Sequence, residues 1–207
     1  FPLQRFAGPR RKVWMQFPIP GIHDYADRRL VAGYPHDCPA HLFHLGSEMK
    51  RKPLDWSYAG QVNNESRRQC ITQLRMLHKG FLHESLGFWQ GIPRDVYYEK
   101  MAESKVVACP AGGAFPESLR VFEALEAKCI PVVEDHLFGG VSYWKYVLKE
   151  EPPVPMLTDW RDFPLLLDRT LQGWPENRDK LQSWWAGYKK GTCRWFMEDL
   201  RELGGID

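Results

Sequence analysis

Two apolar runs stand on either side of one amphipathic segment in the middle of the chain. Val106–Cys109 and Ile130–Val133 are unbroken apolar runs, typical of strands buried on both faces of a sheet. Between them, apolar residues recur at helical spacing across residues 116–127, and Pro116 suits the first position of a helix. A strand, a helix and a second strand with short connections form a parallel βαβ unit. The pattern predicts an α/β fold with a Rossmann-like parallel sheet flanked by helices.

Further elements are predicted on both sides of this unit. A strand over Trp56–Ala59 ends at Gly60, and the helix that follows is capped by Asn63 or Asn64 and stops at Gly80. The remaining predictions are a strand at 13–17, short helices at 24–30 and 97–104, a strand or turn at 152–155, and helices at 162–171, 177–188 and 193–203. Residues 56–207 therefore form the main domain, whereas residues 1–55 are irregular and form a short or incomplete N-terminal part.

Composition and charge exclude several classes of protein. The formal net charge is +2, so the chain as a whole is not a polycation and strong non-specific binding to nucleic acid is not implied. The first 55 residues carry a basic bias, which is the pattern either of a solvated face or of a surface that contacts DNA. No run of about 20 apolar residues is present, so no membrane span is predicted in this chain.

The cysteines and histidines predict no metal site. The five cysteines are scattered without a Cys-x-x-Cys pair, which argues against a disulfide framework and a structural zinc site. Three lie in apolar runs, where a buried free thiol is the ordinary interpretation. We therefore expect a reducing compartment, either the cytoplasm or the interior of a host cell. The spacing of His23, His36, His41 and His44 matches no standard metal site.

The candidate chemistry follows the first strand of the βαβ unit. In open α/β sheets ligands bind at the C-terminal ends of the strands, and the loop Pro110–Phe115 lies at such an end. Gly112 and Gly113 allow the backbone to approach a ligand closely, and the helix that follows offers free N–H groups to an anion. Arg120, one turn into that helix, can bind a phosphate with two hydrogen bonds. Glu123 can accept hydrogen bonds from both hydroxyls of a ribose, so these residues together predict a site for a diphosphate and a ribose.

A simpler interpretation exists for each of these residues. Two consecutive glycines often mark only a turn, and Arg120 and Glu123 at i, i+3 form an ordinary surface ion pair in many helices. Glu117 suits the positive end of the helix dipole, but its charge would repel a nearby phosphate. The site therefore requires that Glu117 point away or that Arg120 offset its charge.

The same region resembles the exostosin family of glycosyltransferases. The segments Tyr98–Gly113 and Pro116–Val133 contain Ser-Lys before the strand, then Cys-Pro-x-Gly, Ser-x-Arg-x-x-Glu-Ala-Leu and Cys-Ile-Pro-Val in that order. The close match covers about 40 residues, and a looser one extends over residues 56–207. The resemblance implies a GT-B glycosyltransferase, with two facing α/β domains. Residues 56–207 would be its nucleotide-sugar donor-binding domain with closing C-terminal helices, and residues 1–55 the end or remnant of the acceptor-side domain.

The resemblance also implies roles for individual residues. Glu123 becomes the ribose ligand, and Arg120 and Ser118 lie on the phosphate side. Gly60 matches the family's glycine at the end of a strand, and Arg68 matches the arginine that follows and makes a second phosphate contact. The next candidate for that contact is Arg67.

Two residues depart from the family's pattern. Lys128 stands where a glycine usually precedes Cys-Ile-Pro, so either Lys128 adopts an unusual backbone conformation or the turn differs. Glu117 stands where an aromatic residue is common, which leaves the specificity for base and sugar open.

The function expected from these residues is transfer of a sugar, hexosyl or related, from a nucleotide diphosphate sugar to an acceptor hydroxyl. The donor is expected to be UDP-linked, and no cofactor beyond the donor is predicted. No Asp-x-Asp motif occurs, so donor binding is expected to be independent of metal. The acceptor is a carbohydrate, a protein or DNA. His23, Asp24 and Asp27 are the candidates for the catalytic base, which would come from the N-terminal side of the cleft.

Two alternatives belong to other classes. One is a DNA-base-modifying glycosyltransferase of viral type, to which the basic N-terminal segment would contribute. The other is a non-catalytic nucleotide-binding domain of the same fold, since a fold by itself does not establish activity.

Overall fold

A computed structural model describes residues 12–33, 52–87 and 90–203 of the chain. The chain divides into two compact units. Unit 1 consists of residues 1–32, 137–152 and 183–207, and unit 2 of residues 33–136 and 153–182. The predicted assignment of residues 1–55 to an acceptor-side domain stays a prediction.

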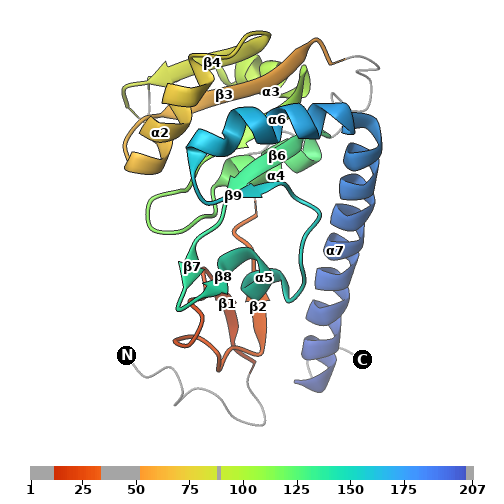
Figure 1. The fold of residues 1–207 in the computed structure, drawn as a ribbon. Helices are drawn as coiled ribbons and strands as arrows, with labels where there is room; N and C mark the ends of the chain where they lie inside the picture. The colour runs from red at the N-terminus through yellow and green to blue at the C-terminus, as the bar shows by residue number, and fades with distance from the viewer. Residues whose placement is uncertain (1–11, 34–51, 88–89, 204–207) are drawn as a thin grey trace. The chain divides into compact units, whose positions relative to one another are not determined.

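Unit 2 is built around one parallel sheet (Figure 1). Its five strands lie in the order β4-β3-β5-β6-β9 and all neighbours pair in parallel. Their bounds are Leu54–Gln61 for β3, Gly80–Ser85 for β4, Ser104–Cys109 for β5, Ile130–Glu134 for β6 and Met156–Leu157 for β9. The predicted α/β fold, a Rossmann-like parallel sheet flanked by helices, is confirmed.

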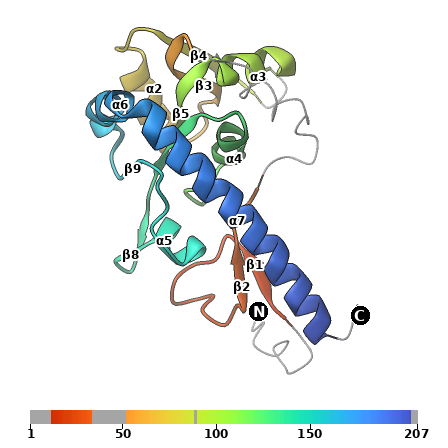
Figure 2. The same ribbon diagram turned by 90° about the vertical axis from the view of Figure 1, so that its right-hand side faces the viewer.

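Helices cover both faces of this sheet. Helices α2 (Glu65–Leu74) and α6 (Phe163–Gln172) lie on one face, and α3 (Arg94–Ala102) and α4 (Leu119–Glu126) lie on the other (Figures 1 and 2). The short 3₁₀ helix η2 (Trp160–Asp162) precedes α6 and contacts α2. From β3 the chain crosses to β4 at one side, and then returns to β5 on the other side of β3. This reversal makes the gap between the C-terminal ends of β3 and β5 the topological switch point of a doubly wound sheet, where such folds bind ligands.

The core of unit 2 lies on both sides of the sheet. Leu74 and Phe163 are fully buried on the side of α2 and α6, and Tyr98 and Phe122 are almost fully buried on the side of α3 and α4. Val106 in the central strand is also fully buried. Apolar residues on both faces of a strand are the reason that β5 and β6 read as continuous apolar runs.

The predicted βαβ unit is present. Val106 pairs with Ile130 and Cys109 with Val133 in parallel register, and α4 is the helix between the two strands. The helix begins at Leu119 rather than at Pro116, with Ser118 as its N-cap.

In the turn before β6, the structure has the first of the two alternatives left open for Lys128, an unusual backbone conformation. Lys128 has a φ of 54°, the left-handed conformation that glycine adopts more easily.

Three other element predictions are wrong. Residues 28–30 form strand β2, not a helix, because they pair with β1. Gly80 does not stop α2 but begins β4, where a Cβ atom would lie 1.9 Å from the ring of Trp56. The two predicted closing helices are one helix, α7 (Trp174–Glu202), because an interior Gly191 costs only about 1 kcal/mol relative to alanine.

Unit 1 joins elements from distant parts of the sequence. They are β1 (Trp14–Gln16), β2 (Arg28–Leu30), the hairpin of β7 (Leu137–Phe138) and β8 (Val141–Ser142), α5 (Tyr143–Leu148) and the second part of α7. The buried carboxylate of Asp199 joins α7 to β1 and β2, because it accepts hydrogen bonds from the indole of Trp14 and from Arg28. These bonds lower the pKa of Asp199 although burial by itself would raise it.

The described cysteines agree with the expectation of free thiols. Cys70, Cys109 and Cys129 are buried and unpaired with one another, Cys193 is exposed and free, and Cys38 lies outside the described residues. None of the helices in the described ranges is long and apolar enough to cross a membrane.

Candidate functional site

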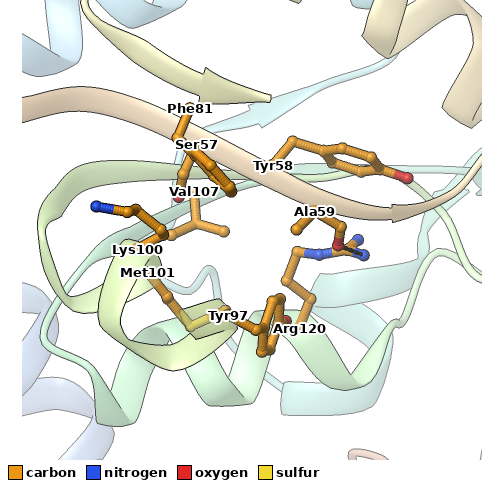
Figure 3. A pocket seen from close by; sticks show the side chains of 9 residues that line it. All are labelled: Ser57, Tyr58, Ala59, Phe81, Tyr97, Lys100, Met101, Val107 and Arg120. Carbon is orange, nitrogen blue, oxygen red and sulfur yellow. Dashed lines mark hydrogen bonds between the residues drawn. The ribbon is translucent and has the colours of Figure 1, made fainter. Parts of the chain in front are cut away.

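Gly60 and Arg120 come together at the switch point. The guanidinium Nη2 of Arg120 donates a hydrogen bond of 2.7 Å to the carbonyl of Ala59, and its Cζ lies 4.5 Å from the centre of the Tyr58 ring (Figure 3). A Cβ atom on Gly60 would lie only 2.3 Å from Nη2. Only glycine at this position therefore allows the arginine to lie against the end of β3.

The guanidinium of Arg120 keeps hydrogen-bonding capacity in this position. Arg120 is 9% exposed, and its Nε and Nη1 atoms are buried without a hydrogen-bond partner in the described structure. Beside it lies a cavity of about 10 Å³, lined on its other sides by β3, β4, β5 and α3 (Figure 3), which has room for about one water molecule. Burial by itself would lower the pKa of Arg120, but Tyr97, Tyr58 and other neighbours raise it, so the group stays charged.

The glycine loop after β5 is held by α2. Asn64, the N-cap of α2, donates from Nδ2 to the carbonyls of Ala111 at 3.2 Å and Gly112 at 2.5 Å. A Cβ atom on Gly112 would lie 2.4 Å from the carbonyl oxygen of Glu117, whereas a Cβ atom on Gly113 would meet nothing within 4 Å. The fold therefore requires glycine at position 112 but not at position 113.

Of the two candidate arginines on α2, Arg67 and not Arg68 is directed at the loop. Arg67 is half-buried and donates to the carbonyls of Ala111 and Gln61. Burial and the nearby charge of Arg120 lower its pKa. Arg68 is exposed and pairs with Glu65 at 2.9 Å.

Ser118 occupies the N-cap position of α4, but its side chain does not cap the helix. Its hydroxyl makes no cap hydrogen bond, and its Oγ is buried without a partner in the described structure. The predicted place of Ser118 on the phosphate side stays a prediction.

The carboxylate of Glu123 is held by two tyrosines of α3. Its Oε2 accepts a hydrogen bond of 2.7 Å from Tyr97, and its Oε1 accepts one of 3.0 Å from Tyr98. The side chain is only 6% exposed. The simpler interpretation of an ion pair with Arg120 is therefore not what the structure describes. The role of Glu123 as a ribose ligand stays a prediction.

A hydrogen-bonded network that was not predicted from the sequence lies at the end of β6. The buried carboxylate of Glu134 accepts hydrogen bonds from Ser66 on α2 and from the indole of Trp160, the latter at 2.7 Å. Its other oxygen lies 2.7 Å from Nε2 of His136. The Ser66 hydroxyl in turn accepts from the backbone N–H of Ala111 at 3.0 Å. The signal was present, because Glu134 and His136 directly follow an apolar strand, at the end where ligands bind.

Hydrogen bonding sets the protonation of this network. Burial by itself would raise the pKa of Glu134, but hydrogen bonds from His136, Ser66 and Trp160 outweigh it, and the pKa is lowered. The hydrogen bond to Glu134 raises the pKa of His136, against the smaller effect of burial. Each partner thus favours the charged form of the other.

The three candidates for a catalytic base lie in unit 1, whereas the residues above lie in unit 2. His23 accepts a backbone hydrogen bond from Ile19 at its Nδ1, and Asp27 accepts one from Val13. Asp24 is exposed and accepts a hydrogen bond from Tyr146, which lowers its pKa and makes it a weaker base. Their catalytic role stays a prediction. Across the described residues no group of three or more histidine, cysteine or acidic side chains is placed to hold a metal ion.

The strand order and the clustered loops define a Rossmann-like domain with its candidate site at the switch point. The family model of the RXYLT1 C-terminal domain matches residues 47–203, and the chain belongs to this family. Among known proteins, ribitol-5-phosphate xylosyltransferase 1 of Danio rerio is 26% identical over 179 residues, covering 76% of this chain and 41% of that protein. The chain thus spans about two fifths of the length of this relative. No solved structure gives a significant match.

Proposed function

We propose that this chain contains the donor-binding domain of a glycosyltransferase that transfers a sugar from a nucleotide diphosphate sugar to an acceptor hydroxyl. The observation that carries the proposal is the convergence of Arg67 and Arg120 at the switch point, beside a loop that brings main-chain groups close. Two arginines this close repel each other, and an anion between them removes that repulsion. A diphosphate is the anion that this class of fold binds at this place.

The polar atoms without partners supply the hydrogen bonds for such an anion. Nε and Nη1 of Arg120 and Oγ of Ser118 are buried and unpaired in the described structure. A buried donor without a partner costs about 1–3 kcal/mol, so a ligand that accepts from it recovers this energy. Charge-assisted bonds from two arginines also neutralise a diphosphate without a metal ion. Metal independence is therefore part of the proposal.

The ribose of the donor is assigned to Glu123. A carboxylate has about four lone-pair positions, and Tyr97 and Tyr98 use one on each oxygen. The ribose hydroxyls would bind the remaining positions or compete with the tyrosines for this carboxylate.

The relative and the sequence resemblance refine the proposal. The relative is named for xylosyl transfer and for ribitol 5-phosphate, so we propose a UDP-linked pentose as the donor and a phosphorylated polyol as the acceptor. The exostosin-like motifs favour a two-domain GT-B arrangement, in which a second domain supplies the acceptor side.

The neighbouring arginines on α2 provide the test. UDP, UDP-xylose, GDP, ADP and CMP are titrated into the wild type, Arg67→Met and Arg68→Met by calorimetry. Arg67→Met should weaken binding of UDP by about tenfold or more, since a charge-assisted hydrogen bond contributes about 1.5–3 kcal/mol. Arg68→Met is the control on the same helix and should bind normally. No binding of any nucleotide to the wild type would contradict the proposal, and loss of binding only in Arg68→Met would contradict the placement of the site.

A further inference from the structure

The end of β6 presents a histidine that a buried carboxylate orients. The ring of His136 is 40% exposed, while the carboxylate of Glu134 beside it is 11% exposed. Glu134 is fixed from two further directions, by Ser66 of α2 and by Trp160 of η2. A carboxylate held in this way fixes the orientation of the imidazole and its tautomer, and stabilises the imidazolium that forms when the ring takes a proton.

This pair is connected to the candidate donor site through hydrogen bonds. His136 bonds to Glu134, Glu134 accepts from Ser66, and Ser66 accepts from the backbone N–H of Ala111. Ala111 belongs to the glycine loop, and its carbonyl accepts hydrogen bonds from Asn64 and Arg67. His136 is thus attached to the same loop at which the diphosphate is proposed to bind.

We infer that His136 is the general base that takes the proton of the acceptor hydroxyl, with Glu134 as its positioning residue. The inference rests on the proposed function. Because the ionised Glu134 can only accept, Nε2 of His136 carries the proton that it donates, and Nδ1 is the atom that accepts the new one. The acceptor oxygen bonds to the anomeric carbon, the bond from that carbon to the β-phosphate oxygen breaks with its electron pair going to the diphosphate, and the acceptor proton goes to Nδ1.

The charges around His136 suit a base better than a phosphate ligand. Within the described ranges, the carboxylates of Glu134 and Asp135 at the end of β6 act on it, and Ser66 of α2 and Trp160 of η2, which fix Glu134, are uncharged. Two carboxylates beside one imidazole raise its affinity for a proton but repel a diphosphate. By comparison, the Asp24 carboxylate has a lowered pKa and is a weaker base.

The test separates turnover from binding. Two quantities are measured for the wild type, His136→Gln, Glu134→Gln and His78→Gln. The first is the rate of UDP-xylose hydrolysis, with water as the acceptor, from pH 5 to 9. The second is the affinity for UDP. His136→Gln should lower kcat by about 10²–10⁴-fold and keep UDP affinity within about threefold. The wild-type rate should rise with pH as His136 loses its proton, and this acid limb should disappear in His136→Gln. Glu134→Gln should move the limb to lower pH, since the raised pKa depends on that carboxylate.

The control variant is His78→Gln. His78 is exposed and precedes β4 at the opposite edge of the sheet, so His78→Gln should behave as the wild type. A His136→Gln protein that keeps the rate and the acid limb while binding UDP would overturn the base role and leave the proposed function standing. If His136→Gln lost UDP binding together with the hydrolysis rate, that result would also overturn the base role. A wild type that neither binds UDP nor hydrolyses UDP-xylose would overturn both.

Discussion

Gly60 and Arg120 meet at the end of β3, where a Cβ atom on the glycine would lie 2.3 Å from Nη2 of the arginine. The two residues are 60 positions apart in sequence, yet a side chain at position 60 would force Arg120 to move. The arginine occupies the space that every other residue at position 60 would fill, and from there it donates to the neighbouring carbonyl of Ala59. One residue of the candidate site thus depends on the absence of a side chain at another.

Gly60→Ala should therefore displace Arg120 from Ala59. We expect a loss of about 1–3 kcal/mol in the free energy of unfolding, the usual cost of forcing an extra carbon into a packed region. UDP affinity should fall as well, because the guanidinium moves. Gly113→Ala is the matched control, since its Cβ atom meets nothing within 4 Å. Denaturant unfolding and calorimetry measure the two effects, and equal values for Gly60→Ala and the wild type would show that Arg120 does not depend on this contact.

Glu123→Gln should lower both stability and nucleotide affinity. Gln cannot accept from Tyr97 and Tyr98 with two oxygens as the carboxylate does, so we expect a loss of about 1–3 kcal/mol in stability. If the carboxylate also binds the ribose, UDP affinity falls about ten- to a hundredfold. Tyr97→Phe separates the two roles, because it removes one hydroxyl and leaves the carboxylate. It should cost stability and leave UDP binding unchanged or tighter. Normal UDP binding by Glu123→Gln would leave only the structural role.

Removal of metal should not abolish donor binding. The positive charges of Arg67 and Arg120 are expected to neutralise the diphosphate, so UDP affinity with EDTA should stay within about tenfold, roughly 1.4 kcal/mol, of the value with added magnesium. Calorimetry in both buffers on one protein preparation measures the difference. A larger loss with EDTA would mean that a cation bridges the diphosphate and that the arginines are insufficient.

The pair of Glu134 and His136 should make stability depend on pH in a defined direction. The pKa of Glu134 is lowered, so its contribution is complete above its ordinary value of 4.5 and is lost as the pH falls through the lowered value. The pKa of His136 is raised, so its contribution is complete below its ordinary value of 6.5 and is lost as the pH rises through the raised value. The pair therefore stabilises most between about pH 4.5 and 6.5.

The measurement compares melting temperatures of the wild type and His136→Gln at several pH values. The difference should be largest near pH 5.5 and should shrink as the pH rises through the raised pKa of His136, because above it the ring is neutral in both the folded and unfolded states. A difference that stays constant with pH would show that the pair is not ionised in the folded protein.

The local pattern of apolar residues was sufficient to predict the βαβ unit, because both of its strands are buried on two faces and its helix has one apolar stripe. Such elements are defined by their own residues. For the turn between α4 and β6 the sequence left two outcomes open at Lys128, and the structure has the left-handed backbone there, the conformation in which many helices end. Local pattern also placed Gly60 at the end of a strand and Gly112 and Arg120 after the first strand of the βαβ unit, whereas the place of Ser118 came from the resemblance to the exostosin family.

Contacts between distant residues decided which side chains point into the candidate site. Whether Arg67 or Arg68 points at the glycine loop depends on the rotation of α2, which the packing of Cys70, Ile71 and Leu74 against the rest of unit 2 fixes. Neighbouring residues on a helix differ by about 100° around its axis, so a sequence motif cannot choose between them without that packing.

For the carboxylates of Glu123 and Glu134 too, the tertiary structure decided which partners they have. The sequence predicted Glu123 as the acceptor for two ribose hydroxyls, which stays a prediction, whereas the position of α3 determined that Tyr97 and Tyr98 donate to its carboxylate. Glu134 gains its partner Trp160 only because β9 and η2 return the chain to the edge of β6. Pattern along the chain determines which side chains reach the C-terminal edge of the sheet. Which of them meet there depends on how helices from distant parts of the sequence pack, because a hydrogen bond forms only within about 3 Å.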